Sequence, residues 1–351
     1  MKVITVHSER TYSIDIGREF TSAIHGLSEN RERVAIIFSE NMKEFIPVFD
    51  SQGAEYFYFA IPDGEEAKSI RTLERVWNWL GAAGFTRSDL IVGIGGGAIT
   101  DFAGYVAASW LRGVDWVAVP TTVAGMVDAA IGGKTGINSD YGKNLIGAFH
   151  SPCRVVIDLA WLPSLSERDF AAGLAEVVKC GFIKDPEILK IIQGRTIADI
   201  RGSHEITHEL IERAIQVKAD VVSGDFKESF EREILNYGHT FGHAVELHSR
   251  YSLRHGECVS IGLVFIAHLS HDLGLISSEI RDLHLSILTG LQLPTSYSQG
   301  SWPDLYAAMK LDKKSRGNTL RFVAISEIGR TQRIENPTEA SLKSAYERVS
   351  Q

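Results

Sequence analysis

Residues 90–101 read LIVGIGGGAITD, in which a β-type apolar run passes through the glycines of residues 95–97 into a helical pattern. Without a Cβ, these glycines let the backbone approach a bulky anion. The amides and the dipole at the start of the following helix then favour negative charge. The loop therefore fits the pyrophosphate of a dinucleotide. Its spacing differs from the usual Gly-x-Gly-x-x-Gly, and a purely structural turn is the alternative.

The strand-and-helix alternation extends to both sides of this loop. Apolar β-type runs occupy residues 34–38, 56–59, 90–93, 116–119 and 155–157. Between the second and third of them, Ile70, Leu73, Val76 and Leu80 recur at helical spacing. This alternation predicts a mostly parallel sheet with helices on its faces and ligands at the carboxyl ends of its strands.

The second half of the chain is predicted to be mainly helical. Helical patterns cover residues 174–183, 206–222, 239–247, 258–273 and 278–288, and the clearest remaining strand is 320–325. We therefore expect a Rossmann-like α/β domain over residues 1–160 and a mainly helical domain over residues 161–351. No Pro/Ser linker separates them, so a tight interface with the active site between the domains is expected.

Composition narrows the class of protein. Among 351 residues, 36 are basic and 44 acidic, and without a long basic run we expect no nucleic-acid partner. The longest apolar stretch, residues 90–111, is interrupted by glycines and Asp101, which favours a buried strand–turn–helix over a membrane span. Residues 1–6 lack a signal-peptide core, and the three cysteines are widely spaced. A cytoplasmic protein is expected.

A second motif, NYGHTFGHA at residues 236–244, predicts a metal site. His239 and His243 are four residues apart and share one face of a helix. His255 would come from the next helix or from the loop leading into it. Three imidazoles suit zinc with an open coordination position. Ordinary polar or interface histidines are the alternative, because the motif lacks the glutamate of the common zinc-protease pattern.

Other polar residues lie where a phosphorylated ligand would need them. Loop 61–68 carries Glu65 and Lys68, and the sequence Pro-Thr-Thr at residues 120–122 ends a strand. The glycine-rich loops 132–136 and 142–144 each carry a lysine. A lysine held by glycines is a suitable phosphate contact, with a solvated surface lysine as the alternative. Glu176 and Lys179 share one helix face, as a buried ion pair or as site residues.

Together these segments resemble the dehydroquinate synthase family of sugar-phosphate cyclases. The match runs from residues 62–65 to residues 312–314. It depends on the order and spacing of GGG at 95–97 with Asp101, PTT at 120–122, GGKTG at 132–136, GKNLIG at 142–147, AE at 175–176 and GHTFGH at 238–243.

The resemblance implies a site residue by residue. The metal ligands would be Glu176, His239 and His255, so that His243 faces the substrate phosphate rather than the ion. The groups around NAD would be Glu65, Lys68, Gly96, Gly97, Asp101, Thr121, Thr122, Lys134 and Lys143. The groups around the substrate would be Asp128, Lys134, Asn144, Lys179, Lys218, Arg232, Asn236 and Lys314 or its neighbour Lys313. Arg112 would reach the active site of a partner subunit, which implies a homodimer.

The resemblance also implies the reaction. The substrate would be 3-deoxy-D-arabino-heptulosonate 7-phosphate and the products 3-dehydroquinate and phosphate, a step of aromatic amino acid biosynthesis. NAD+ would oxidise carbon 5 transiently, phosphate would leave by β-elimination, and reduction, ring opening and aldol closure would follow. The implied cofactors are NAD+ and one divalent ion, Zn2+ or Co2+. One position departs from the family: Ser39 stands where an acidic residue often lies near the adenosine.

Other activities fit the residues less well. Glycerol-type polyol dehydrogenases share the domain plan, but their uncharged substrates have no use for so many cations. Valiolone-type cyclases act on a sugar phosphate without a carboxylate, whereas an aminodehydroquinate synthase differs by one substrate group and stays open. In a non-catalytic NAD-binding scaffold, these charges would be costly to bury without a ligand.

Overall fold

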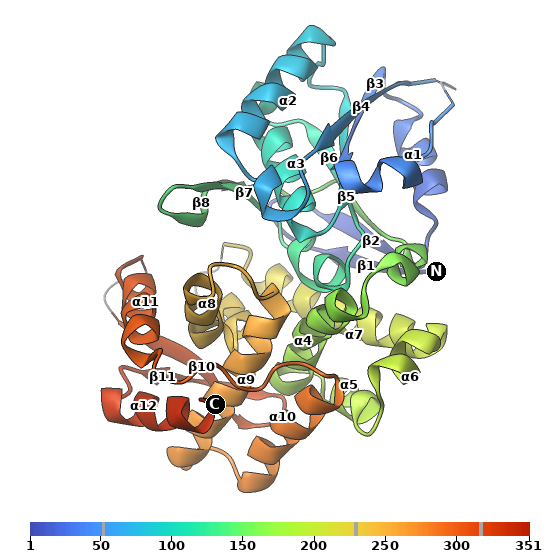
Figure 1. Cartoon of the computed structure of the whole chain (residues 1–351). Coiled ribbons are helices and arrows are strands. Elements are labelled where there is room, and N and C mark those ends of the chain that lie inside the picture. The colour runs from blue at the N-terminus through green and yellow to red at the C-terminus, as the bar shows by residue number, and fades with distance from the viewer. Residues whose placement is uncertain (51–52, 228–230, 316–318) are drawn as a thin grey trace. The chain divides into compact units, whose positions relative to one another are not determined.

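The computed structural model describes residues 1–50, 53–227, 231–315 and 319–351, and the side chains of residues 311–315 are outside this description. Its elements form two compact units (Figure 1). Unit 1 comprises Met1–Leu165 and Lys218–Lys227, and unit 2 comprises Ser166–Val217 and Glu228–Gln351. Residues 218–227, which the sequence pattern assigned to the helical half, thus pack with the α/β half.

Unit 1 is built on a seven-stranded sheet with the order β1-β2-β9-β6-β5-β3-β4. The predicted apolar runs form its parallel strands β3 (Arg33–Ser39), β4 (Glu55–Ile61), β5 (Leu90–Gly95), β6 (Asp115–Pro120) and β9 (Arg154–Ile157). β2 (Tyr12–Ile16) extends the sheet in parallel, and β1 (Lys2–Val6) pairs with it in the antiparallel sense. β5 is buried along its whole length, as its unbroken apolar sequence requires.

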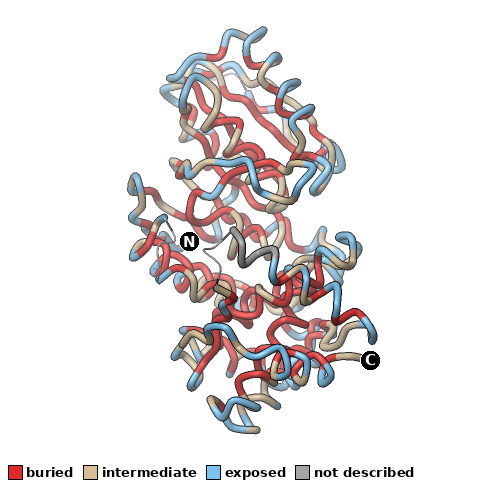
Figure 2. The backbone as a smooth tube through the Cα atoms, turned by 90° about the vertical axis from the view of Figure 1, so that its left-hand side faces the viewer, coloured by how far each residue is buried: buried red, intermediate tan, exposed pale blue. Residues whose placement is uncertain are grey.

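Helices cover the sheet and are fixed to it by close contacts. They are α1 (Phe20–Ser28), α2 (Ile70–Ala82) and α3 (Gly97–Ser109), with the short turns η1 (Glu40–Phe45), η2 (Gly64–Ala67), η3 (Trp110–Arg112), η4 (Gly125–Ala129) and η5 (Leu159–Ser164). α3 packs on β5 and β6. A Cβ at Gly93 would lie 2.5 Å from the Cβ of Ala103, so glycine is needed where β5 and α3 meet. In Figure 2 the buried segments lie in the interior and the exposed ones at the periphery.

A small antiparallel hairpin in unit 1 was not predicted. β7 (Lys134–Ser139) and β8 (Gly142–Phe149) pair where the sequence indicated two glycine-rich loops. Gly136 and Gly147 lie opposite each other, and a Cβ at Gly147 would come within 2.3 Å of the Thr135 carbonyl oxygen. The glycines therefore serve close strand pairing, and they hid the apolar alternation that normally reveals a strand.

Unit 2 is mainly helical and contains the predicted helices, except for residues 218–222 of the one predicted at 206–222. Its elements are α4 (Glu167–Ile183), α5 (Pro186–Ile192), α6 (Ile197–Gly202), α7 (His204–Gly224, whose last turns belong to unit 1), η6 (Glu231–Asn236), α8 (His239–His248), α9 (His255–Asp272), α10 (Ser278–Gly290), α11 (Trp302–Ser315), β10 (Arg321–Glu327), β11 (Arg330–Glu335) and α12 (Glu339–Arg348). α9 is largely buried and packs against α4, α8, α10 and α12. The predicted fold class, Rossmann-like α/β followed by mainly helical, is confirmed.

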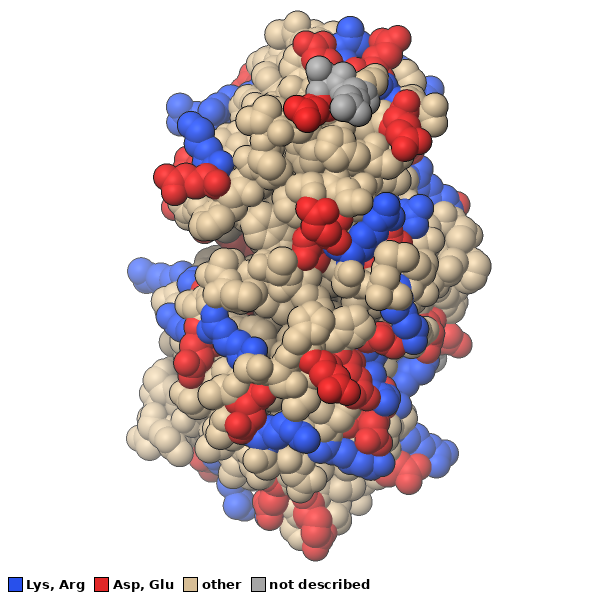
Figure 3. Space-filling view, turned by 90° about the vertical axis from the view of Figure 1, so that its right-hand side faces the viewer, with Lys and Arg blue, Asp and Glu red and all other residues tan. Residues whose placement is uncertain are grey.

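Basic and acidic side chains are present in similar numbers in the sequence, and both occur on the surface. On the face drawn in Figure 3, acidic and basic side chains are interspersed. None of the helices in the described residues combines the length and the hydropathy that crossing a membrane requires.

Candidate active site

Three helices of unit 2 bring the implied metal ligands together. Glu176 lies in the middle of α4, His239 is the first residue of α8, and His255 is the first residue of α9. One ligand atom from each lies within 4.8 Å of the others. Glu176 and His239 are buried and His255 is partly exposed. Such a set of two imidazoles and one carboxylate, reachable from one side, suits a catalytic zinc with an open position.

Each histidine is oriented by its Nδ1 atom. His239 Nδ1 lies 3.0 Å from the carbonyl oxygen of Tyr237, which can only accept, so Nδ1 carries the proton. His255 Nδ1 lies 3.4 Å from the Glu246 carboxylate. The Nε2 atoms lie 3.4 Å (His239) and 3.3 Å (His255) from the same oxygen of Glu176. Carbonyl or carboxylate support of this kind is typical of metal-ligating histidines.

The charge of Glu176 also fits a bound cation. Burial by itself raises the pKa of this carboxyl group, but the adjacent Lys179 ammonium and His239 lower it well below its usual value. Neither carboxylate oxygen of Glu176 accepts a hydrogen bond of standard geometry from the described residues. The close contacts of this carboxylate are ionic, with Lys179 and His239. Burial, and then the charge of Lys179, lower the pKa of His239. An ionised Glu176 beside a neutral His239 is the protonation state that metal binding needs. Burial lowers the pKa of His255, but Glu176 and Glu246 outweigh it and raise the pKa to about 10, so an ion would have to displace the proton of His255.

His243 occupies a different position, as the resemblance implies. It is exposed, and its ring centroid lies 5.3 Å from that of His239 and 5.9 Å from that of His255. A second possible metal group joins His243, Glu246 and His255. That group would use the Glu246 carboxylate, which already contacts His255, so we favour the more buried set with Glu176. The initial interpretation of His239, His243 and His255 as three ligands is replaced by this arrangement.

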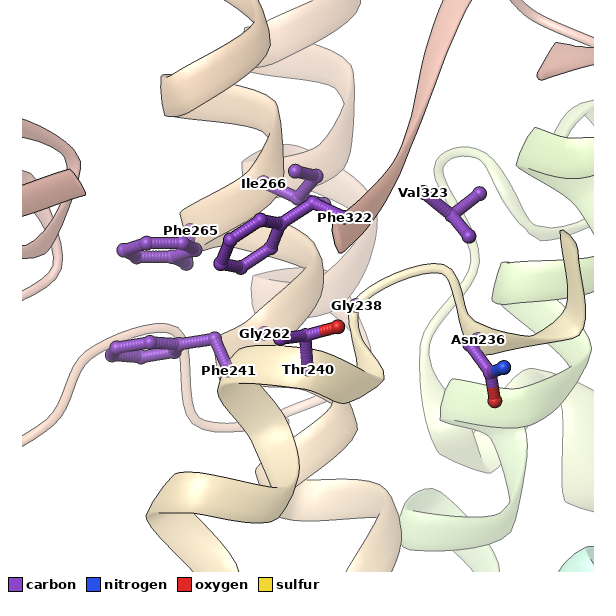
Figure 4. A pocket seen from close by; sticks show the side chains of 9 residues that line it. All are labelled: Asn236, Gly238, Thr240, Phe241, Gly262, Phe265, Ile266, Phe322 and Val323. Atoms are coloured by element: carbon purple, nitrogen blue, oxygen red, sulfur yellow. The ribbon is translucent and has the colours of Figure 1, made fainter. Parts of the chain in front are cut away.

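Two further predicted substrate groups lie just before α8. Arg232 in η6 is 2% exposed, and Asn236 ends η6. In Figure 4, Asn236 points away from the aromatic side chains of Phe241 and Phe265. The rings of these two phenylalanines are stacked 4.0 Å apart, so this pocket is apolar packing between α8 and α9 rather than a polar ligand site.

The glycine loop of unit 1 has the predicted geometry. Gly96 caps α3 and Gly97 is its first residue, directly after β5. A Cβ at Gly97 would lie 2.8 Å from the Cβ of Ala129. Thr121 donates its backbone N–H to Gly95, and the Thr122 hydroxyl accepts a hydrogen bond from Gly125. Both threonines follow β6, so they lie beside the glycine loop, which follows the neighbouring strand β5.

A buried lysine joins three of the predicted groups. Lys68 is 1% exposed, and its ammonium lies 2.7 Å from the Asp101 carboxylate and also donates to the Asn144 side chain. Burial raises the pKa of Asp101, while Lys68 opposes that shift. Asn144 has a positive φ of 57°, a conformation that asparagine tolerates better than most residues. Lys143 lies 3.5 Å from Glu65.

Asn138 on β7 belongs to this cluster, and sequence reasoning missed it. Its side chain donates to Glu65 at 2.7 Å and accepts from the Asn144 backbone at 3.0 Å, and its own backbone N–H donates to Lys68 at 2.8 Å. One asparagine therefore links the hairpin to the loop before α2. Its place between the motifs at 132–136 and 142–147 was the available signal, but hydrogen-bond partners are not visible in sequence.

The structure describes the side chains of most of the remaining predicted residues. Lys218 in α7 donates to both the carbonyl and the carboxylate of Asp128 within unit 1. Lys134 starts β7 and is exposed. Ser39 donates to Asp63 at 2.6 Å, so a carboxylate lies beside the position where the chain departs from the family. The side chains of Lys313 and Lys314 lie outside the described residues.

Arg112 is exposed in a strained turn. It has a φ of 67°, and the preceding Leu111 has a φ of 48°. Two successive non-glycine residues in the left-handed region are uncommon and frequently accompany function.

The fold and the site define a class of metal- and nucleotide-dependent enzymes with an α/β domain followed by a helical domain. Residues 58–172 match the model of the 3-dehydroquinate synthase N-terminal domain, and residues 173–315 match that of the C-terminal domain. A 3-dehydroquinate synthase of Streptomyces avermitilis is 48% identical over 345 residues, 97% of this chain and 95% of the relative. The chain belongs to the 3-dehydroquinate synthase family.

Solved structures share the fold. The 2-epi-5-epi-valiolone synthase ValA of Streptomyces hygroscopicus subsp. jinggangensis, with NAD+ and Zn2+ bound, is 25% identical with a TM-score of 0.90 and covers 99% of this chain and 98% of its own. A 2-deoxy-scyllo-inosose synthase complexed with carbaglucose-6-phosphate, NAD+ and Co2+ is 21% identical with a TM-score of 0.86, covering 99% of this chain and 100% of its own.

Proposed function

We propose that this chain is a 3-dehydroquinate synthase, a carbon–oxygen lyase that converts 3-deoxy-D-arabino-heptulosonate 7-phosphate to 3-dehydroquinate and phosphate. The observation that carries the proposal is the group of Glu176, His239 and His255, with ligand atoms within 4.8 Å of one another in a chain of this family. The glycine loop and the Lys68 cluster support NAD+ as the second cofactor.

In this reaction the chain's own residues would hold the ion, limit the negative charge beside it and neutralise the anionic groups of the substrate. The bound groups supply reversible hydride transfer at carbon 5 and acidification of the substrate hydroxyls. Glu176, His239 and His255 hold the divalent ion, and Lys179 limits the negative charge beside it. Cations, among them Lys218 and Arg232, neutralise the substrate carboxylate and phosphate. The departing phosphate can accept the proton of carbon 6, so a strong protein base is not required there.

A single assay tests the reaction. The heptulosonate phosphate is supplied with NAD+ and the metal, and phosphate release, ring product and NADH absorbance are followed together. We expect one phosphate per ring and no growing NADH signal, because the hydride returns to carbon 5. Accumulating NADH without phosphate would instead indicate a polyol dehydrogenase. Turnover of a heptulose phosphate that lacks the carboxylate, or of the amino analogue in preference, would indicate a sister cyclase.

The Asn138 contacts give a first prediction. Asn138→Ala is expected to weaken NAD+ binding by roughly tenfold, because the two side-chain hydrogen bonds to Glu65 and Asn144 are lost, at about 0.5–1 kcal/mol each for solvent-accessible bonds. Calorimetric titration with NAD+ measures the effect. Ser139→Ala is the matched control, since the Ser139 hydroxyl accepts a hydrogen bond from the Tyr141 backbone in the turn of the same hairpin. Equal NAD+ affinity in both variants would show that the Asn138 contacts do not position the cofactor site.

A homodimer with an exchanged Arg112 is also proposed. Arg112 lies in a strained turn, and the hairpin β7–β8 exposes apolar side chains, including Tyr141 and Leu145, which are 94% and 63% exposed. Exposed apolar groups of this kind mark interaction surfaces. We propose that the partner is a second copy of this chain, and that the enzyme acts in the cytoplasm.

Mixing two inactive variants tests the exchange. Arg112→Ala and Glu176→Gln are each expected to be nearly inactive, and mixing them should recover about one quarter of normal turnover, because half of randomly formed dimers contain one intact site. If mixing gives no recovery although sedimentation shows dimers, Arg112 does not serve the partner's site.

A further inference from the structure

Tyr237 and His284 form a buried pair that the proposed reaction does not use. Tyr237 joins η6 to α8, and His284 lies on α10. Both are 0% exposed, and the Tyr237 hydroxyl lies 2.8 Å from His284 Nε2. Burying two polar side chains is costly unless they are satisfied, so their retention in a helical core requires an explanation.

The hydrogen bonds of this pair have one direction. His284 Nδ1 lies 2.7 Å from the carbonyl oxygen of Ile280, which can only accept, so Nδ1 carries the proton. Nε2 then accepts the hydrogen bond from the Tyr237 hydroxyl. Burial lowers the pKa of His284 to about 4, which keeps the ring neutral at pH 7. Phe182 of α4 stacks on this ring at 3.5 Å with an interplanar angle of 9° and fixes its plane.

The other end of Tyr237 contacts a metal ligand. Its backbone carbonyl accepts the hydrogen bond from His239 Nδ1. Gly238 lies between them with a φ of 79°, and a Cβ there would come within 2.9 Å of the Leu263 side chain. The backbone between the Tyr237 ring and His239 is therefore tightly confined.

We propose that the Tyr237–His284 pair positions the metal site: it fixes Tyr237, whose carbonyl holds the tautomer and the direction of His239. The inference rests on the proposed metal ligands and adds two positioning residues to them. Direct supports of metal-ligating histidines typically contribute 10- to 100-fold in metal affinity, so a support acting through one more bond should contribute roughly 3- to 30-fold.

The test measures metal affinity rather than turnover. Zn2+ is titrated into metal-free protein in competition with a chromophoric chelator, for the native chain, Tyr237→Phe, His284→Phe and the double variant. We expect Kd to rise roughly tenfold in each single variant and no further in the double variant, since both substitutions break the same bond. His284→Phe keeps an aromatic ring against Phe182.

Thr207→Val is the matched control. Its hydroxyl donates to the Ile200 carbonyl at 2.7 Å and is also buried within unit 2. Among the described residues, no hydrogen bond joins it to Glu176, His239 or His255. The thermal midpoint of each metal-free protein reports any general loss of stability. A Tyr237→Phe affinity within twofold of native, the same loss in Thr207→Val, or additive losses in the double variant would overturn the positioning role. Native protein that binds no stoichiometric Zn2+ would instead refute the metal site itself.

Discussion

Thorough chelation is expected to abolish phosphate release, and one equivalent of Zn2+ or Co2+ is expected to restore it. The ligand atoms of Glu176, His239 and His255 lie within 4.8 Å of one another, and His239 and His255 are oriented by acceptors outside the site. Because a Lewis acid contributes several kcal/mol to a step that develops charge on oxygen, the loss should be on the order of 10³-fold or more. Phosphate release is measured before chelation, after it, and after metal is returned.

Glu176→Gln should reproduce the chelated state without a chelator. It keeps the size of the side chain and removes the charge that holds the ion, so turnover and Zn2+ affinity should fall together. Glu187→Gln is the matched control, because Glu187 and Lys190 form the same i, i+3 ion pair as Glu176 and Lys179, but on the surface of α5. Full activity in protein shown by atomic absorption to be metal-free would exclude this mechanism.

Lys218→Ala and Arg232→Ala are expected to reduce kcat/KM severely while NAD+ affinity stays nearly unchanged. Lys218 is 6% exposed and holds Asp128, and Arg232 is 2% exposed. Losing a buried charge-assisted contact to the anionic substrate costs roughly 2–5 kcal/mol, or about thirty- to several-thousand-fold. Steady-state kinetics with the heptulosonate phosphate and calorimetry with NAD+ separate the two effects.

Lys190→Ala provides the comparison for lysine loss. Its ammonium pairs with Glu187 at the surface and should leave kinetics unchanged. Thermal melting of the Arg232 variant shows whether the buried arginine also supports folding. Near-normal kcat/KM in folded Lys218→Ala or Arg232→Ala protein would remove the proposed role of that residue in substrate binding.

The elements that could be predicted are those with strong periodicity. The run of residues 90–101 gave β5, the glycine loop and the start of α3, and the spacing of Leu73, Val76 and Leu80 gave α2, because core burial imposes these patterns directly. The hairpin β7–β8 was not predicted, because its glycines allow close strand pairing but contribute no side chains to an apolar pattern. β1 and β2 were not predicted because polar residues interrupt their apolar sequences, KVITV and YSIDI.

Site residues divide in the same way. His239 and His255 followed from residue type and spacing, but Glu176 lies on a distant helix, so only the family resemblance joined it to them. Asn138, Tyr237 and His284 act through hydrogen bonds to backbone groups and neighbours far along the chain. Nothing in their local sequence encodes those partners, which only the folded chain brings together.

The path of α7 limits how this protein can be dissected. Residues 218–227 belong to unit 1, where Ser223 accepts a hydrogen bond from the His7 backbone at 3.0 Å and Phe226 contacts Phe149 with ring centroids 5.3 Å apart. A recombinant fragment that stops at Leu165 would leave part of its own core uncovered and would lack Lys218. Experiments that split the gene or exchange domains therefore have to add residues 218–227 to the N-terminal fragment. Dividing the gene at one position cannot produce all of unit 1.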